Sequence, residues 1–299
     1  MNSKKRKTTR PMRNRLATAL MSVFILALFA LPAFSGLVWA KGILFDNRDP
    51  RKVVNIEPMQ VRAIDQSGQL KPFNEPIVSI TFDDGWETTY SKALPLLQKE
   101  GLPTTQYIIG GVFDNHSYMS VAQVQSMQKA GHEIGSHTMT HPDLTQLTDA
   151  SLSWELVQSK TVLTEKFGPI KDFASPLGAA NDRTIAAVKQ NYRSQRNTEG
   201  DPNTVANKGV NLGSEFNIYS ITGYTVRKTT TMQDLKDMLQ FTATYSGWVV
   251  LTYHQVDDSG ETYSITPETL AKQLKLISDS HIRVATVGQV LDAYTAGGK

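Results

Sequence analysis

Residues 76–89, "PIVSITFDDGWETT", join a short apolar run to a pair of acidic side chains. The apolar residues are typical of a buried strand, and Gly85 ends it. A single Asp is common at the turn after a strand, but two adjacent carboxylates repel each other. Because a purely structural strand end has little use for both Asp83 and Asp84, the pair indicates a positive charge close by.

Short apolar runs and helical patterns alternate through the rest of the chain. For example, "TTQYIIGG" (104–111) is typical of a strand, whereas "SVAQVQSMQKAG" (120–131) is typical of a helix with Ser120 as its N-cap. A later helix is expected to begin after Thr266, its cap. This alternation predicts parallel strands joined by right-handed crossovers, and hence an α/β barrel or an open sheet. In both folds the chemistry gathers at the carboxyl ends of the strands.

Polar side chains follow several of the expected strands. Asp83 and Asp84 follow the first, "HEIGSH" ends in His137 with His141 four residues later, and "LTYH" ends in His254. Each feature has a structural alternative. A His-x-x-x-His pair also occurs as two solvated side chains, and a histidine after an apolar run can be a satisfied core residue. Their shared position at strand ends favours one common site.

Two imidazoles and one carboxylate are a common set of three protein ligands for a divalent metal ion that keeps an open position. We therefore interpret His137, His141 and one of the two Asp residues as metal ligands. Coordination lowers the pKa of a bound water towards 7, and the second Asp then serves as the base that takes its proton. With His254 as the acid, the set predicts hydrolysis of an amide or an ester.

Three of these stretches resemble motifs of a known family. "TFDDGW", "SHTMTHP" and "LTYH" are similar to the first, second and fifth motifs of the polysaccharide deacetylases, the NodB-homology proteins of carbohydrate esterase family four. The resemblance spans residues 76–294 and implies a distorted (β/α)7 barrel, with parallel strands inside and helices outside. It also implies one divalent ion, usually zinc. Cobalt and nickel are alternatives, because two His and an Asp accept all three ions. The implied roles are base for Asp83, metal ligand for Asp84, His137 and His141, and acid for His254.

The third motif departs from the family pattern. It normally reads Arg-x-Pro-Tyr/Phe-Gly, but residues 174–178 here read Ala-Ser-Pro-Leu-Gly. Ala174 therefore takes the place of the Arg that orients the base, and we expect either slower turnover or another brace for Asp83. Members that act on β-1,6-linked N-acetylglucosamine polymers show a similar Phe-Ala-x-Pro stretch. Pro176 and Leu177 are the candidate substrate-binding residues, with a backbone N–H near Leu177 as the donor to the acetyl oxygen.

Further candidates come from the fourth motif and from aromatic residues. "NYRSQRNTEGD" (191–201) resembles the fourth motif, and its Asp201 is the candidate partner of His254. Trp86, Trp248 and Tyr253 are candidate walls of a sugar groove. Large side chains next to apolar strands mostly pack in the core, so each of these aromatic residues has that alternative.

The first 40 residues are typical of an export signal. Residues 1–15 hold seven Lys and Arg, residues 16–40 hold no charge, and small residues precede a cleavage position after Ala40. A retained membrane anchor is the alternative, because 25 apolar residues can span a bilayer. Without this segment, 24 basic and 28 acidic residues leave a net charge of −4, which does not favour nucleic acid as a partner. We expect the protein to be secreted, periplasmic or attached to the outer face of the cytoplasmic membrane.

The sequence thus predicts a signal or anchor (1–40), an extended arm (41–75) and a catalytic domain (76–299). The absence of cysteine means that the core alone stabilises the fold. We expect a monomer whose partner is an acetylated glycan polymer. The main hypothesis is N-deacetylation of N-acetylglucosamine-containing polysaccharide (peptidoglycan, chitin-like or exopolysaccharide). An O-acetyl esterase, such as an acetylxylan esterase, and a non-catalytic glycan-binding relic are the alternatives.

Overall fold

The computed structural model describes residues 73, 75–113, 115–198, 209–213 and 216–296. The predicted signal or anchor lies outside the described residues, and so does the predicted arm except for Phe73 and Glu75. Among the helices of the described part, none is long and apolar enough to cross a membrane.

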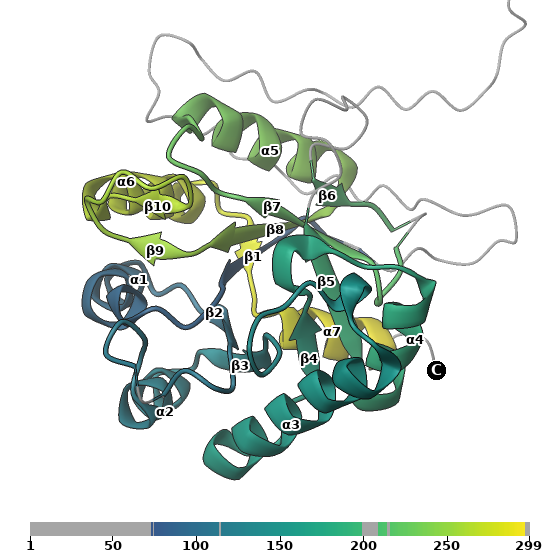
Figure 1. The fold of residues 1–299 in the computed structure, drawn as a ribbon. Helices are drawn as coiled ribbons and strands as arrows, with labels where there is room; N and C mark the ends of the chain where they lie inside the picture. The colour runs from purple at the N-terminus through teal and green to yellow at the C-terminus, as the bar shows by residue number, and fades with distance from the viewer. Residues whose placement is uncertain (1–72, 74, 114, 199–208, 214–215, 297–299) are drawn as a thin grey trace, which may run out of the picture. The chain divides into compact units, whose positions relative to one another are not determined.

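Within the described residues, seven parallel strands form a closed ring (Figure 1). In ring order they are β1 (Ile77–Phe82), β2 (Thr104–Ile108), β3 (Glu133–Ser136), β4 (Asp172–Ala174), β5 (Ser194–Thr198), β7 (Ile221–Thr225) and β8 (Trp248–Tyr253). Pairing of β1 with β8, from Ile77↔Trp248 to Phe82↔Tyr253, closes the ring. The predicted (β/α)7 barrel is therefore confirmed.

Shorter strands distort this ring. Strand β11 (Arg283–Val284) pairs with the first residues of β1, whereas β2 pairs with its last three. Strand β6 (Val210–Asn211) runs antiparallel to β8 at its beginning. Strands β9 (Gln255–Val256) and β10 (Ser264–Ile265) form a separate two-stranded sheet after the ring.

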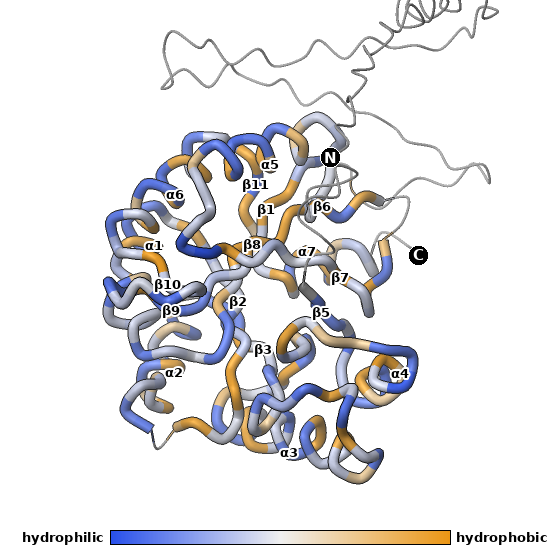
Figure 2. Tube along the Cα trace, turned by 45° about the horizontal axis from the view of Figure 1, so that its top comes forward, coloured by the Kyte–Doolittle hydropathy of each residue, from blue (hydrophilic) through white to orange (hydrophobic). Residues whose placement is uncertain are grey.

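The helices of the described part are η1 (Thr89–Ala93), α1 (Leu94–Glu100), α2 (Val121–Lys129), η2 (Leu144–Gln146), α3 (Asp149–Phe167), η3 (Pro176–Gly178), α4 (Asp182–Asn191), α5 (Met232–Tyr245), α6 (Pro267–Asp279) and α7 (Val287–Ala296). Helices α1 to α6 lie around the outside of the ring (Figure 1), whereas α7 packs across the amino ends of its strands. The predicted caps are confirmed, because the Ser120 side chain accepts the N–H of Gln123 and the Thr266 side chain accepts that of Thr269. Hydrophilic and hydrophobic residues alternate along α5 and α6, as expected for helices with one buried face (Figure 2).

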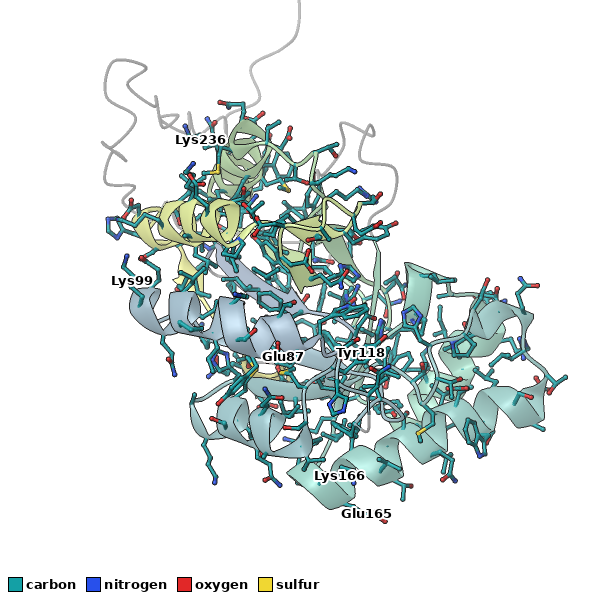
Figure 3. The ribbon with its side chains drawn as sticks, turned by 60° about the vertical axis from the view of Figure 1, so that its left-hand side comes forward. Glu87, Lys99, Tyr118, Glu165, Lys166 and Lys236 are labelled. Atoms are coloured by element: carbon teal, nitrogen blue, oxygen red, sulfur yellow. The ribbon has the colours of Figure 1, made fainter. Side chains whose placement is uncertain are left out.

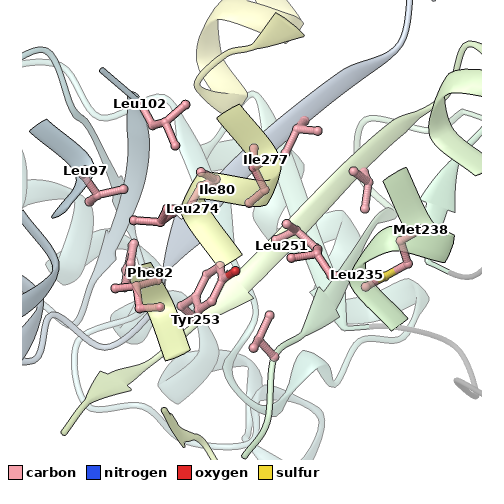
Figure 4. Packing of buried hydrophobic residues seen from close by; sticks show 14 of the residues in the cluster. Ile80, Phe82, Leu97, Leu102, Leu235, Met238, Leu251, Tyr253, Leu274 and Ile277 are labelled. Carbon is pink, nitrogen blue, oxygen red and sulfur yellow. The ribbon is translucent and has the colours of Figure 1, made fainter. Parts of the chain in front are cut away.

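The largest core cluster fills the layer between β1, β8 and helices α1, α5 and α6 (Figure 4). Tyr253 belongs to this cluster: it is fully buried, and its ring stacks on Phe82 with centroids 5.4 Å apart. Trp248 is also fully buried and donates its indole N–H to Ser79 Oγ at 2.9 Å. The prediction that Tyr253 and Trp248 line a sugar groove is therefore wrong, because neither ring reaches the surface.

A charged network lies at the amino ends of the strands. Glu133, the first residue of β3, accepts hydrogen bonds from Thr105 Oγ1 at 2.7 Å and from the N–H of Gly288 in α7 at 2.8 Å. Asp172, the first residue of β4, pairs with Arg193. Burial, followed by the Asp172 charge, raises the pKa of Glu133 to about 8. Glu133 thus ties α7 to the barrel and has a structural role.

Candidate functional site

The carboxyl ends of three strands bring the predicted site residues together. Nε2 of His137, which follows β3, lies 3.8 Å from Asp83 Oδ2 and 3.6 Å from Asp84 Oδ1. Nε2 of His141 lies 3.5 Å from the same Asp84 oxygen. Nε2 of His254, which follows β8, lies 3.9 Å from Asp83 Oδ2. Residues up to 171 positions apart in the chain therefore form one cluster of two carboxylates and three imidazoles.

Asp84, His137 and His141 have the chemistry of a metal site. One ligand atom from each lies within 4.8 Å of the others. Asp84 Oδ1 is buried and, among the described residues, has no hydrogen-bond partner. Nδ1 of His137 lies 2.8 Å from the carbonyl oxygen of Ala174 and must donate to it, so Nε2 presents a lone pair to the cluster. Burial lowers the pKa of His137 to about 4, which keeps the ring neutral at neutral pH. These residues fit one divalent cation.

The backbone that presents these ligands is strained. Asp84 has φ 71°, Thr138 φ 67° and His141 φ 64°, all in the left-handed region that residues other than glycine rarely adopt. Such conformations persist only where surrounding contacts hold them, and they gather at functional sites. One such contact is the N–H of His141, which donates to Thr138 Oγ1 at 2.9 Å.

Glu155 of α3 holds the loop between the two histidine ligands. Its Oε2 accepts the N–H of Met139 at 2.8 Å and that of Thr140 at 2.9 Å. Glu155 was not among the site residues predicted from the sequence. A signal was present, because a charged residue lies there on the buried face of the helix, next to Leu152 and Leu156. A buried carboxylate on such a face needs donors from elsewhere in the fold.

Arg196 of β5 supplies the brace that the third motif lacks. Its Nη2 donates to Asp83 Oδ2 at 2.5 Å, and its side chain is only 1% exposed. Burial by itself raises the pKa of Asp83, but the positive charge of Arg196 beside it outweighs this effect, so the net pKa lies below the usual value. Arg196 is the register partner of Ala174 on the neighbouring strand. The guanidinium therefore arrives at the same level of the barrel from the adjacent strand.

The barrel interior makes room for this arginine. A Cβ on Gly223 of β7 would lie 2.7 Å from Arg196 Cδ and 2.9 Å from Thr252 Oγ1. On another side, the guanidinium carbon lies 5.3 Å from the centroid of the Tyr107 ring, within range of a cation–π contact. Gly135 in turn leaves space for Tyr107, since a Cβ there would lie 2.6 Å from that ring. Arg196 is thus held by shape as well as by charge.

The predicted partner of His254 and the predicted substrate-binding residues Pro176 and Leu177 are the remaining candidates. Nδ1 of His254 is buried and, in the part of the chain that the structure describes, has no hydrogen-bond partner. Asp201, its predicted partner, lies outside the described residues. Pro176 begins η3, and Leu177 after it has φ 57° and a 66% exposed side chain. The donor role of the Leu177 backbone N–H stays a prediction.

Trp86 lies beside the metal-ligand cluster. Its indole Nε1–H donates to Asp84 Oδ2 at 2.9 Å. Its ring stacks on Tyr118 (labelled in Figure 3), with centroids 4.6 Å apart and planes 19° from parallel. Both rings line a pocket of about 440 Å³ together with Asp84 and His141. Of the predicted groove aromatics, Trp86 therefore faces an open pocket next to the cluster.

Comparison with known proteins shows what this chain resembles. Residues 70–193 match the family model described as "Polysaccharide deacetylase". The chain is 29% identical over 223 residues to the peptidoglycan-N-acetylglucosamine deacetylase of Bacillus cereus, covering 74% of this chain and 90% of that protein. It is 30% identical over 133 residues to the poly-beta-1,6-N-acetyl-D-glucosamine N-deacetylase of Staphylococcus aureus, covering 40% and 46%. The match to the polysaccharide deacetylase family therefore covers residues 70–193, which include Asp83, Asp84, His137 and His141.

Other matches cover a smaller share of the relatives' length. A solved structure also matches the fold. The chain is 35% identical over 99 residues to the chitin deacetylase of Pestalotiopsis sp, and it spans half or less of the length of several curated relatives that it matches. The Xyl-CE4 domain of a multidomain xylanase from the hindgut metagenome of Trinervitermes trinervoides shares its fold with a TM-score of 0.51. That match has 21% identity and covers 75% of this chain and 92% of the domain.

Proposed function

We propose that this chain is a metal-dependent N-deacetylase that removes acetyl groups from N-acetylglucosamine-containing polysaccharide and releases acetate. The observation that carries the proposal is the meeting of an arginine-braced Asp83 with Asp84, His137 and His141 at one end of the barrel. Two relatives with names that specify N-acetylglucosamine deacetylation support the N-acetyl bond as the target.

Asp84, His137 and His141 would hold one divalent ion, for which we propose zinc, with cobalt or nickel as alternatives. When bound, such an ion polarises the acyl oxygen and lowers the pKa of a coordinated water. Asp83 takes the proton of the attacking water. Its Oδ2 is held by Arg196, while its Oδ1 has no hydrogen-bond partner among the described residues and can accept the proton. Nε2 of His254, on the other side of Asp83, donates a proton to the leaving amine.

The pocket lined by Trp86 and Tyr118 suits a sugar ring, because flat aromatic faces pack well against the apolar faces of pyranoses. We propose an acetylated glycan polymer as the substrate and the outer side of the cytoplasmic membrane as the place of action. The proposed location rests on the basic and apolar residues 1–40. With no cysteine in the chain, an oxidising compartment adds no disulfide to the fold.

Acetate release from a panel of glycans tests this function. The panel contains peptidoglycan, chitin oligomers, poly-β-1,6-N-acetylglucosamine and acetylxylan, each assayed before chelation, after chelation and after return of Zn²⁺, Co²⁺ or Ni²⁺. The proposal predicts acetate from one or more N-acetylglucosamine polymers, its loss on chelation and its recovery with metal. Acetate from acetylxylan alone would establish the O-acetyl esterase instead. Protein that binds metal and glycan but releases no acetate would establish the non-catalytic alternative.

A further inference from the structure

The two oxygens of Asp84 have different surroundings. Oδ1 lies 3.6 Å from His137 Nε2 and 3.5 Å from His141 Nε2, and it has no hydrogen-bond partner in the described part of the chain. Oδ2 accepts the indole N–H of Trp86 at 2.9 Å. A carboxylate with one oxygen fixed in this way cannot rotate freely about its χ2 bond. The indole therefore fixes the orientation of the carboxylate plane, so that the other oxygen faces the two imidazoles.

Trp86 is itself fixed by the loop that precedes α2. Its ring stacks on Tyr118, and residues 86 and 118 form an isolated backbone bridge. On either side of this bridge, the N–H of Met119 donates to Gly85 O at 2.8 Å and the N–H of Glu87 donates to Ser117 O at 2.9 Å. These contacts hold the indole from both its backbone and its ring face, so its N–H has a defined direction before any ion binds.

We propose that Trp86 is a positioning residue for the metal site: its indole N–H orients Asp84 so that Oδ1 is presented with the two imidazoles. The inference rests on the proposed metal-dependent function and adds a residue to it. Groups that hydrogen-bond to metal ligands fix ligand orientation, and their loss typically weakens metal binding by about 10- to 100-fold. Because the same indole lines the pocket beside His141, a sugar ring in that pocket would contact the group that orients Asp84.

Metal affinity of the full chain tests the proposal directly. Trp86→Phe keeps an aromatic ring to stack on Tyr118 but removes the N–H donor. The control is Trp154→Phe, because Trp154 lies on α3 with 48% of its surface exposed. Zn²⁺ dissociation constants are measured by competition with a chelator, and thermal melting is recorded for each variant. We expect Trp86→Phe to bind Zn²⁺ about 10- to 100-fold more weakly and Trp154→Phe to match the wild type.

A measurement on unmodified protein keeps the test valid if Trp86→Phe folds poorly. In protein labelled with ¹⁵N-tryptophan, the indole N–H resonance of Trp86 should shift on Zn²⁺ addition, whereas that of Trp154 should not. A wild type that binds no divalent ion would refute the metal-dependent function itself. Two results with a wild type that binds Zn²⁺ would overturn the positioning role alone. One is equally tight Zn²⁺ binding by Trp86→Phe, and the other is an unshifted Trp86 resonance in the wild type.

Discussion

Arg196 Nη2 lies 2.5 Å from Asp83 Oδ2, so the carboxylate that we propose as the base is paired with an arginine of β5 rather than of β4. The register of β4 and β5 explains how an arginine on β5 can reach Asp83. Ala174, which replaces the third-motif arginine, is the direct partner of Arg196 on the next strand. A side chain from either position can reach the same carboxylate from inside the barrel, because residues paired across parallel strands lie at the same level.

Replacing Arg196 should impair the chemistry more than metal binding. Arg196→Met keeps much of the side-chain volume but leaves Asp83 without the charge that holds Oδ2 and lowers its pKa. We expect kcat for acetate release to fall by roughly 100-fold while the bound-metal content is retained. Arg183→Gln is the control, because Arg183 forms an exposed ion pair with Asp149. A variant with unchanged kcat would show that the brace is dispensable.

Gly223→Ala should act through Arg196. The added Cβ would lie 2.7 Å from Arg196 Cδ, so the arginine must move away from Asp83. Overpacking of this kind also destabilises a protein by about 1–3 kcal/mol. We expect a lower kcat and a lower melting temperature. In an Arg196→Ala background the contact with Cδ is gone and the 2.9 Å contact with Thr252 Oγ1 remains, so a double-mutant cycle should show a smaller further loss. Equal losses in both backgrounds would rule out this coupling.

Glu133 makes stability depend on pH. Its pKa is about 8 in the folded chain against an ordinary 4.5, so between these values the folded state binds a proton that the unfolded state has lost. Its contribution to stability is therefore largest below pH 4.5 and falls as pH rises towards 8, by up to about 1.4 kcal/mol per pH unit.

Glu133→Gln resembles the protonated acid and should lose this dependence. Urea unfolding at pH 6 and pH 9 measures it: the wild type should lose more stability than the variant on going to pH 9. The comparison between the two proteins removes the contribution of the other titrating groups. Parallel losses in the two proteins would mean that Glu133 is already ionised at pH 6.

The sequence predicts the main cluster well because its members sit at strand ends. Asp83, Asp84, His137, His141 and His254 all follow strands of one parallel barrel, whose geometry brings such positions together. Tyr253 was predicted to line a sugar groove but is buried, because adjacent residues of a strand point to opposite faces. His254 reaches the site, whereas Tyr253 and its register partner Phe82 pack under the helices.

The roles of Arg196 and Glu155 depend on contacts that no local pattern specifies, although a charge on the buried face of α3 marks Glu155 as a residue that needs partners. The role of Arg196 depends on the alignment of β5 with β4 and on the space left by Gly223. That of Glu155 depends on how α3 packs over the loop that carries His141. The leader, the arm and Asp201 stay predictions.

The central claim is that Asp83 acts as the base while three other side chains hold the ion. Asp83→Asn tests it most directly, with metal content and acetate release measured on the same preparation. The account predicts about one divalent ion per chain, as in the wild type, and acetate release reduced by roughly 100-fold or more. Acetate release at the wild-type rate from the Asn variant, or loss of its metal together with its activity, would contradict it.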